Sequence, residues 1–212
     1  MYILTASDFG GVWYWNRYPG ARVDSETPFY QLNIPAVYNS WNFSQRFPDH
    51  AELRAYMAHV DSVLGLRKDV TFNAHVNSVE WNAATSTWTV RTESGLRASA
   101  RWLVLATGLL HRTHTPDFPG LAEYGGLLKH SGAWDEGISV KGKKVAIVGA
   151  GATSVQIVQE VGKEAEQLTG MCFGFEGCGV VCDLEKVLLK SFFFASSCPV
   201  FLVFLRYYNG VR

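Results

Sequence analysis

The sequence "VAIVGAGATS", Val145–Ser154, decides the fold of this chain. Its apolar start predicts a buried strand over Val145–Val148, and the residues that follow Ser154 have the period of an amphipathic helix. Between the two, Gly149 permits a tight turn and Gly151 lets a phosphate approach the backbone, while Ser154 is small enough for the helix to pack on the strand. A strand, a glycine turn and a helix in this order are typical of a doubly wound domain that binds a dinucleotide at the helix N-terminus.

The residues after this helix do not continue as such a domain usually does. A second strand is expected there, with an acidic residue for a ribose hydroxyl or a basic residue for a 2′-phosphate. Instead the chain enters "TGMCFGFEGCG", residues 169–179, which has no clean period. We therefore expect a dinucleotide site that is begun but not finished. A sharp strand-to-helix turn that binds no ligand would give the same pattern.

The residues upstream predict a helix and an antiparallel β-meander within an α/β fold. Residues 49–66 have helical spacing, with Asp49 placed as the N-cap. Residues 70–82 and 87–92 alternate as strands, and residues 96–108 end in a buried strand at Leu103–Ala106. The apolar stripe of the helix comprises Leu53, Tyr56, Met57, Val60 and Leu64.

Composition excludes several classes of protein. The 212 residues contain 19 basic and 19 acidic side chains, so there is no electrostatic footprint for nucleic acid or for an anionic membrane. The start has neither the basic lead nor the apolar run of a signal peptide, so we expect a cytoplasmic protein. None of the four cysteines, which all lie in the last fifth of the chain, has metal-binding spacing, and we expect no metal site. The apolar run Phe192–Leu205 is too short for a confident membrane span and contains Pro199.

A second unusual stretch lies near the start. "GGVWYWNRYPGARVD", Gly10–Asp24, holds two Trp, two Tyr, two Arg and three Gly in fifteen residues. Glycine and proline break helices and strands, and the aromatic rings have no regular period. This pattern predicts a structured loop that lies against something large and flat.

Three stretches together resemble the Baeyer–Villiger class of flavin-containing monooxygenases. They are the Gly10–Tyr30 stretch, the glycine turn "GAGATS", and "YGGLLKHSGAW", Tyr124–Trp134. The last fits the FxGxxxHxxxW fingerprint of that class, with Tyr124 in place of Phe. Its other fingerprint residues are Gly126, His130 and Trp134. The resemblance covers about residues 8–168, and the final Trp favours this class over related heteroatom-oxidising and N-hydroxylating flavoproteins.

The resemblance implies two cofactors, FAD and NADP(H), and two small-molecule partners, a ketone and molecular oxygen. Asp24 would lie near both the flavin and the nicotinamide and is the candidate catalytic residue. His130 and Trp134 would lie in a linker that couples domain movement to catalysis. The cofactor-binding residues that it implies are Val12, Trp13, Tyr14, Trp15, Arg22, Val23, Asp24, Tyr30, Val76, Gly149, Ala150, Gly151, Ala152, Thr153, Ser154, Val155 and Gln156.

The fold that the resemblance implies is a partial flavoprotein with two dinucleotide-binding (Rossmann-like) domains and an antiparallel β-meander insertion. Residues 1–140 would form a partial FAD-binding domain that lacks its first βαβ unit, and residues 141–168 would begin the NADP-binding domain. Residues 169–212 would be a divergent tail of unknown structure. A shortened gene product, a retained intron or a faulty gene model would each give such a chain.

The expected function is that of an FAD- and NADPH-dependent monooxygenase that inserts oxygen next to a ketone to give an ester or lactone, in secondary metabolism. We expect this chain by itself to have little or no activity. Three alternatives stay open: a non-catalytic remnant or interaction module, a nucleotide-binding module that uses the glycine turn alone, and a heteroatom-oxidising flavin monooxygenase.

Overall fold

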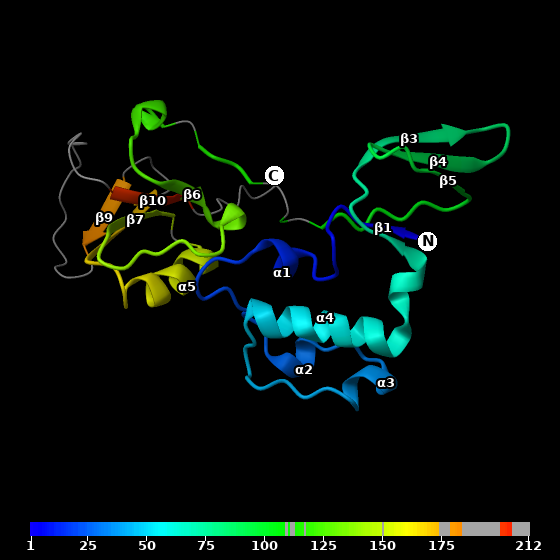
Figure 1. Cartoon of the computed structure of the whole chain (residues 1–212), viewed down its shortest axis with the longest axis horizontal. Helices are drawn as coiled ribbons and strands as arrows, with labels where there is room; N and C mark the ends of the chain where they lie inside the picture. Colours follow the sequence, from blue (N-terminus) through cyan, green and yellow to red (C-terminus); the bar gives the residue numbers. More distant parts are fainter. Residues whose placement is uncertain are drawn as a thin grey trace. The chain divides into compact units, whose positions relative to one another are not determined.

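The computed structural model describes residues 1–108, 110, 113–116, 118–149, 151–173, 179–183 and 200–204. Two compact units make up the chain (Figure 1). Unit 1 comprises Met1–Tyr14 and Ser25–His111, and unit 2 comprises Trp15–Asp24 and Arg112–Arg212. The aromatic stretch near the start therefore contributes to both units.

The helices of unit 1 begin at residues suited to helix starts. The short helices α2 (Thr27–Tyr30) and α3 (Pro35–Tyr38) each have a proline in their first two positions, where its missing N–H costs nothing. The long helix α4 (His50–Leu64) is capped by Asp49, whose carboxylate accepts a 2.9 Å hydrogen bond from the Glu52 amide. It ends at Gly65, whose left-handed backbone (φ 61°) suits glycine. The predicted helix and its cap are confirmed.

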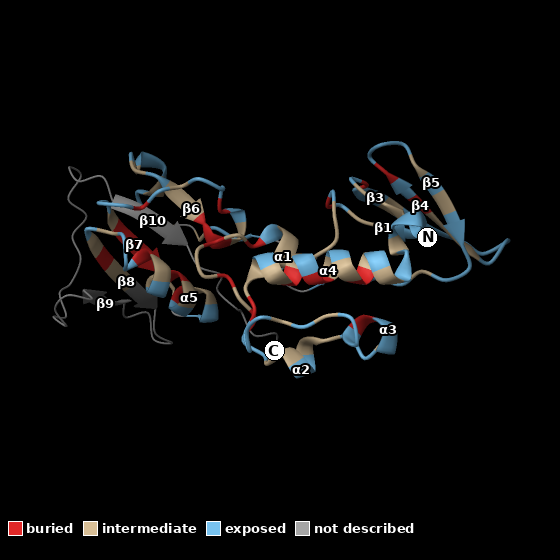
Figure 2. Ribbon diagram, turned by 60° about the horizontal axis from the view of Figure 1, so that its bottom comes forward, coloured by how far each residue is buried: buried red, intermediate tan, exposed pale blue. Residues whose placement is uncertain are grey.

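The core of unit 1 lies along one face of α4 (Figure 2). Leu53, Tyr56 and Val60 are buried, and Tyr56 and Val60 pack with the buried Val37 of α3. Met57 packs at the edge of this cluster, whereas Leu64 is 36% exposed in the last turn. The predicted apolar stripe is confirmed except at Leu64, because the helix turns its final residue out of the core.

The strands of unit 1 form two small sheets. β1 (Tyr2–Ile3) pairs in parallel with β2 (Val70–Thr71), which follows the 3-10 turn η1 (Leu66–Asp69). β3 (Val76–Asn82), β4 (Thr87–Thr92) and β5 (Arg97–Ala100) form an antiparallel meander. The predicted meander is confirmed, although the predicted strand over 70–82 is two strands. The break lies at Asn73, which has a left-handed backbone (φ 52°).

The predicted buried strand at Leu103–Ala106 is wrong. These residues have no regular structure, and Val104 and Leu105 are 85% and 73% exposed. A strand is buried only when neighbouring strands pair with its edges and other elements cover its faces. No described strand pairs with residues 103–106. The apolar sequence alone could not reveal that this pairing is missing.

Unit 2 contains one five-stranded sheet of order β6-β10-β7-β8-β9. The first four strands are parallel and β9 is antiparallel to β8. Its elements are η2 (Leu121–Glu123), β6 (Leu128–His130), η3 (Ser131–Ala133), β7 (Lys144–Val148), α5 (Ala152–Val161), β8 (Gln167–Phe173), β9 (Gly179–Asp183) and β10 (Val200–Phe204).

The presence of β8 corrects the expectation that the nucleotide unit stops after its first helix. Five consecutive residues of β8, Gln167–Met171, pair in register with Lys144–Val148 of β7. The second parallel strand is thus present, and it runs across residue 169, where the tail was expected to begin. Gly170 lies in its middle, and its apolar residues do not alternate cleanly with polar ones, so the sequence pattern does not reveal the strand.

Strand β7 is the centre of unit 2 (Figure 2). On one face, Val145 and Ile147 pack with Ile157 and Val161 of α5. On the other face, Ala146 and Val148 pack with the partly buried side chains of Phe118, Leu121, Tyr124 and Leu128. Both faces of the strand are covered, as the continuous apolar run predicts.

Candidate functional site: a glycine turn and the segment held against its helix

The glycine turn has the geometry that its residues predict. Gly149 follows β7 with φ 120°, a backbone conformation that residues with a side chain rarely adopt. Gly151 is the N-cap of α5, in extended conformation (φ −76°, ψ 178°), and it brings no capping side chain. The amide of the buried Ser154 donates a 2.9 Å hydrogen bond to the Gly151 carbonyl. Ala150 lies outside the described residues.

The turn is positioned where nucleotide sites form in such sheets. It lies at the carboxyl end of a buried parallel strand and at the positive end of a ten-residue helix. Ala152 is exposed, Thr153 is partly exposed, and the side chain of Val155 is 57% exposed. The start of α5 therefore presents backbone and small side chains at the surface.

Gln156 is the last of the predicted cofactor-binding residues, and its side chain forms hydrogen bonds to other residues of the protein. Its amide oxygen accepts hydrogen bonds from the Tyr18 hydroxyl (2.9 Å) and the Arg22 amide (3.4 Å). Its amide nitrogen donates to the Arg22 carbonyl at 3.0 Å. Gln156 therefore holds a distant part of the chain, the segment 18–22, against α5.

This segment leads directly to the candidate catalytic residue. Tyr18 and Ala21 are buried in the same core cluster as Trp134. Val23 is 3% exposed, and the next residue, Asp24, is exposed. Trp15, three residues before this segment begins, is 44% exposed. Unit 2 thus presents an exposed carboxylate at the end of a firmly packed segment.

Unit 1 brings together two of the predicted flavin-binding residues. The Trp13 indole N–H donates a 2.5 Å hydrogen bond to the Tyr30 hydroxyl, and the two rings meet edge to face with centroids 6.2 Å apart. Both side chains are only partly buried, as is Val12. The Tyr14 hydroxyl shares a 2.6 Å hydrogen bond with Ser7. The predicted loop contains one helical turn, α1 (Val12–Trp15), which the irregular spacing of its rings concealed.

Val76 is the remaining predicted residue of unit 1. It begins β3 beside a register shift between Val76 and Ser78, and its side chain is 36% exposed.

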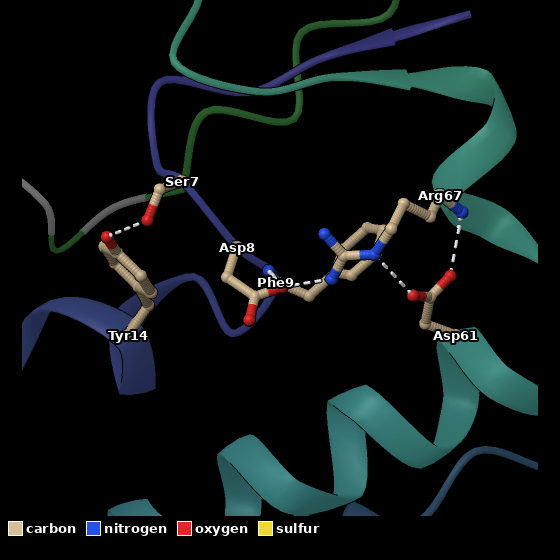
Figure 3. A network of polar contacts seen from close by, with 6 residues as sticks. All are labelled: Ser7, Asp8, Phe9, Tyr14, Asp61 and Arg67. Carbon is tan, nitrogen blue, oxygen red and sulfur yellow. Dashed lines mark hydrogen bonds and ion pairs between the residues drawn. The ribbon is translucent and has the colours of Figure 1, made fainter.

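A polar network that the sequence did not reveal anchors the aromatic loop of unit 1, which is the part of the aromatic stretch at Gly10–Tyr14 (Figure 3). Arg67 pairs with Asp8 (2.5 Å) and with Asp61 of α4 (3.0 Å). Its guanidinium also lies over the rings of Phe9 and Phe72, 5.5 and 4.8 Å from their centroids. The network ties the residues just before Gly10 to the end of α4. In the sequence, Asp8 and Arg67 lie 59 positions apart and form no motif.

The charges of this network shift the pKa values of its members. Partial burial raises the pKa of Asp8, but hydrogen bonds from Arg67 and from the Phe9 amide, with the positive charges of Arg67 and Arg54, lower it overall. The hydrogen bonds to Asp8 and Asp61 raise the pKa of Arg67. Asp8 and Arg67 are therefore a charged pair over the whole neutral range.

The fingerprint residues belong to the packing of unit 2. Trp134 is 7% exposed in the core beside β7, and Tyr124 packs on the opposite face of the strand. His130 ends β6 and is buried, and its Nδ1 accepts a 3.0 Å hydrogen bond from the Gly132 amide. Gly126 is exposed. Close by, Glu136 forms an ion pair with Arg17, which ties the fingerprint region to the segment 15–24.

Within the part of the chain that the structure describes, none of the helices has the length and apolar character of a membrane span. No group of three His, Cys, Asp or Glu side chains there could hold a metal ion, and the side chains of all four cysteines lie outside it.

Comparisons with known proteins agree with the motifs. The family model described as flavin-binding monooxygenase-like matches residues 5–181. The FAD-binding monooxygenase acrE of Aspergillus aculeatus is 42% identical over 163 residues, which are 76% of this chain and 28% of that protein. The cyclopentanone 1,2-monooxygenase of a Comamonas species is 38% identical over 77% of this chain and 30% of its own length. The chain thus spans about 30% of the length of the curated relatives it matches.

Solved structures give the same result. An oxidised steroid monooxygenase bound to NADP has a TM-score of 0.74 and is 39% identical, over 79% of this chain and 33% of that one. The α/β architecture and the three-stranded antiparallel sheet agree with this likeness. The chain belongs to the flavin-binding monooxygenase-like family, and its homologues include Baeyer–Villiger monooxygenases.

Proposed function

We propose that this chain carries the nicotinamide-dinucleotide turn and part of the flavin surface of a Baeyer–Villiger-type monooxygenase. The overall reaction would be ketone + O2 + NADPH + H⁺ → ester or lactone + NADP⁺ + H2O. One oxygen atom enters the C–C bond beside the carbonyl and the other leaves as water. FAD, when bound, supplies the electron transfer from NADPH to oxygen. Everything else would depend on how the protein's own residues bind and orient these groups.

The glycine turn fits the pyrophosphate of NADP(H). Gly149 provides the positive φ that turns the chain out of β7, and Gly151 presents backbone without a side chain at the N-cap. The first amides of a helix have no partner within the helix, and its dipole favours an anion there. We propose that Gly149–Val155 bind the dinucleotide, with Ala152 and Thr153 at the surface beside it.

The Trp13–Tyr30 pair fits a flat aromatic cofactor. The two rings fix one another by a hydrogen bond and an edge contact, yet neither is sealed in the core. Large rigid rings of this kind bind planar ligands with little loss of conformational entropy. We propose that Val12, Trp13, Tyr14 and Tyr30 lie along FAD, with Val76 contributing at its edge.

Asp24 fits a role in orienting the nicotinamide. Its carboxylate is exposed at the end of a segment whose preceding residue, Val23, is almost fully buried. A carboxylate fixed in this way can accept a hydrogen bond from the carboxamide of a nicotinamide ring. Arg22 beside it would add a positive charge for a phosphate, while His130 and Trp134 would join the nucleotide unit to the rest of the enzyme.

The observation that carries this proposal is the β7–α5–β8 unit, with its glycine turn at the carboxyl end of a parallel strand. The test is to titrate the purified 212-residue chain with NADP⁺ and with FAD, and then to follow ketone-dependent NADPH consumption. We expect saturable NADP⁺ binding and weak FAD binding. Trp13→Ala should weaken FAD binding about three- to tenfold, whereas Trp81→Ala, an exposed control in β3, should not change it.

Failure of both ligands to bind would contradict the proposal. Binding of NADP⁺ without FAD would favour the second candidate, a nucleotide-binding module, because unit 2 holds the turn and the segment 15–24 in one compact body. We expect little or no turnover, since the chain spans about 30% of its relatives' length.

A further inference from the structure

The three contacts of Gln156 form an unusually specific attachment. The two polar ends of its side chain bond the N–H and the C=O of a single residue, Arg22, as a neighbouring strand would. The Tyr18 hydroxyl supplies the remaining hydrogen bond to the amide oxygen. A side-chain amide that bonds both backbone groups of one residue fixes that residue's position and its orientation.

The backbone of the segment also packs closely against α5 at the same place. A Cβ atom on Gly20 would lie 2.7 Å from the carbonyl oxygen of Gln156 and 3.0 Å from Cγ of Glu160. Gly20 also has φ +78°, so both its conformation and its lack of a side chain let the segment lie directly on α5. Tyr18 and Ala21 then pack into the core with Ile157. The segment is therefore held by hydrogen bonds, by close contact and by burial.

The same contacts argue against a phosphate-binding role for the Gln156 side chain. Its donor nitrogen faces the Arg22 carbonyl, and its oxygen accepts from Tyr18 and Arg22. Gln156 also lies four residues into α5, about 6 Å along the helix axis from Ala152. A phosphate at the helix N-terminus would thus meet backbone amides of the first turn rather than this side chain.

We propose that Gln156 is a positioning residue, which fixes the backbone at Arg22 and thereby holds Asp24, two residues further on, at one place relative to the nucleotide turn. This inference rests on the proposed function for its catalytic meaning and replaces the expected phosphate contact of Gln156. The helix that begins at the nucleotide turn and the segment that ends at the candidate catalytic carboxylate then form one rigid piece.

The test compares three variants of the full 212-residue chain by amide hydrogen exchange. In Gln156→Ala, the Arg22 amide loses its hydrogen bond, and the other two hydrogen bonds of the Gln156 side chain are removed as well. Hydrogen exchange at the Arg22 amide should therefore accelerate about five- to tenfold. Exchange in α5 itself should stay within about twofold. Gln159→Ala, on the exposed side of the same helix, is the matched control and should leave the Arg22 amide unchanged.

The variant Gln156→Glu adds a second measurement, because it should make the attachment of residues 18–24 depend on pH. At pH 7 the introduced carboxylate cannot donate to the Arg22 carbonyl and repels it, so residues 18–24 should exchange faster than in the unaltered chain. Below about pH 4, near the ordinary pKa of a glutamate carboxyl, the protonated group can donate again, and exchange relative to the unaltered chain should return toward equality. This arm also decides the question if Gln156→Ala fails to fold.

Unchanged exchange at Arg22 in Gln156→Ala, or no recovery of Gln156→Glu at low pH, would overturn the proposal. NADP⁺ affinity separates the phosphate-ligand alternative: positioning predicts a change within about twofold, and a tenfold loss with unchanged exchange would assign Gln156 to the phosphate. If the unaltered chain binds no NADP⁺, the proposed function fails, while the exchange result still decides whether Gln156 holds the segment.

Discussion

The two units hold their predicted ligand-binding residues in different ways. In unit 2, a strand covered on both faces and a helix with a buried side support the glycine turn, so the site is built on the core. In unit 1, the Trp13–Tyr30 pair is only partly buried, and the adjoining residues are anchored by Arg67, whose side chain is 52% exposed. A site built on a buried strand is fixed by packing, whereas one anchored at the surface depends on charge and on its surroundings.

The difference predicts where each unit is vulnerable. Core substitutions should damage the nucleotide turn through lost packing. Changes of pH or salt should act mainly on the aromatic loop.

The largest effect is expected from Ile147→Ala in the centre of β7. Ile147 is fully buried, and truncation of such a side chain costs about 2–5 kcal/mol in the free energy of unfolding. Hydrogen exchange should show the loss in β7 and α5. The counterpart in unit 1, Leu53→Ala, removes an equally buried side chain and should weaken α4 instead. An equal loss of protection in both units from either variant would show that the units are not distinct.

An effect of similar size is expected from Gly20→Ala. The added methyl group would meet the Gln156 carbonyl oxygen at 2.7 Å in a backbone with φ +78°, so overpacking of about 1–3 kcal/mol adds to left-handed strain of about 1–2 kcal/mol. Gly125→Ala is the matched control, because open space surrounds that position. Thermal unfolding measures both. Equal melting temperatures for the two variants would mean that the segment does not lie on α5.

Tyr124→Phe should stabilise unit 2 by about 1 kcal/mol. The Tyr124 hydroxyl is buried beside β7 and has no hydrogen-bond partner among the described residues, and burial raises its pKa. Phenylalanine, which the fingerprint carries at this position, removes that polar group without leaving a cavity. Denaturant unfolding checks the sign, and a destabilised variant would indicate a partner for the hydroxyl.

The smallest effect on stability is expected at low pH and comes from Asp8. Because the pKa of Asp8 is lowered in the folded chain, its contribution to stability is complete above its ordinary pKa of about 3.9 and is lost as the pH falls through the lower folded value. Asp8→Asn should remove this part of the pH dependence, with a small loss at pH 7, since the side chain is 47% exposed. Unfolding followed at pH 6 and pH 3 tests this, and identical pH profiles would rule out the Asp8–Arg67 pair as the anchor.

The sequence predicted what local chemistry determines. The turn at Gly149, the cap at Asp49 and the meander follow from residue types at fixed spacing, and the structure has all three. The predicted division at residues 140 and 168 stays a prediction about cofactor domains. The compact units divide differently, because residues 15–24 pack with the nucleotide unit.

What the sequence did not predict depends on contacts between distant residues. The hydrogen bonds of Gln156 join residues more than 130 positions apart, and the Arg67 network joins the chain start to the end of α4. Leu103–Ala106 has the composition of a buried strand, but only the folded chain reveals that no described strand pairs with it. Strand β8 has a glycine in its middle and no clean alternation of apolar residues, so it does not stand out without its partner β7.

The most direct test of the central claim is a calorimetric titration of NADP⁺ into the 212-residue chain and into Gly151→Val. The backbone of Gly151 is extended, a conformation that valine adopts freely, so the variant should keep its fold while its side chain blocks the approach of a pyrophosphate. We predict saturable binding to the unaltered chain and at least a tenfold loss in the variant, with unchanged hydrogen exchange in β7. Equal affinities, or no binding to either protein, would contradict the assignment of this turn to a dinucleotide.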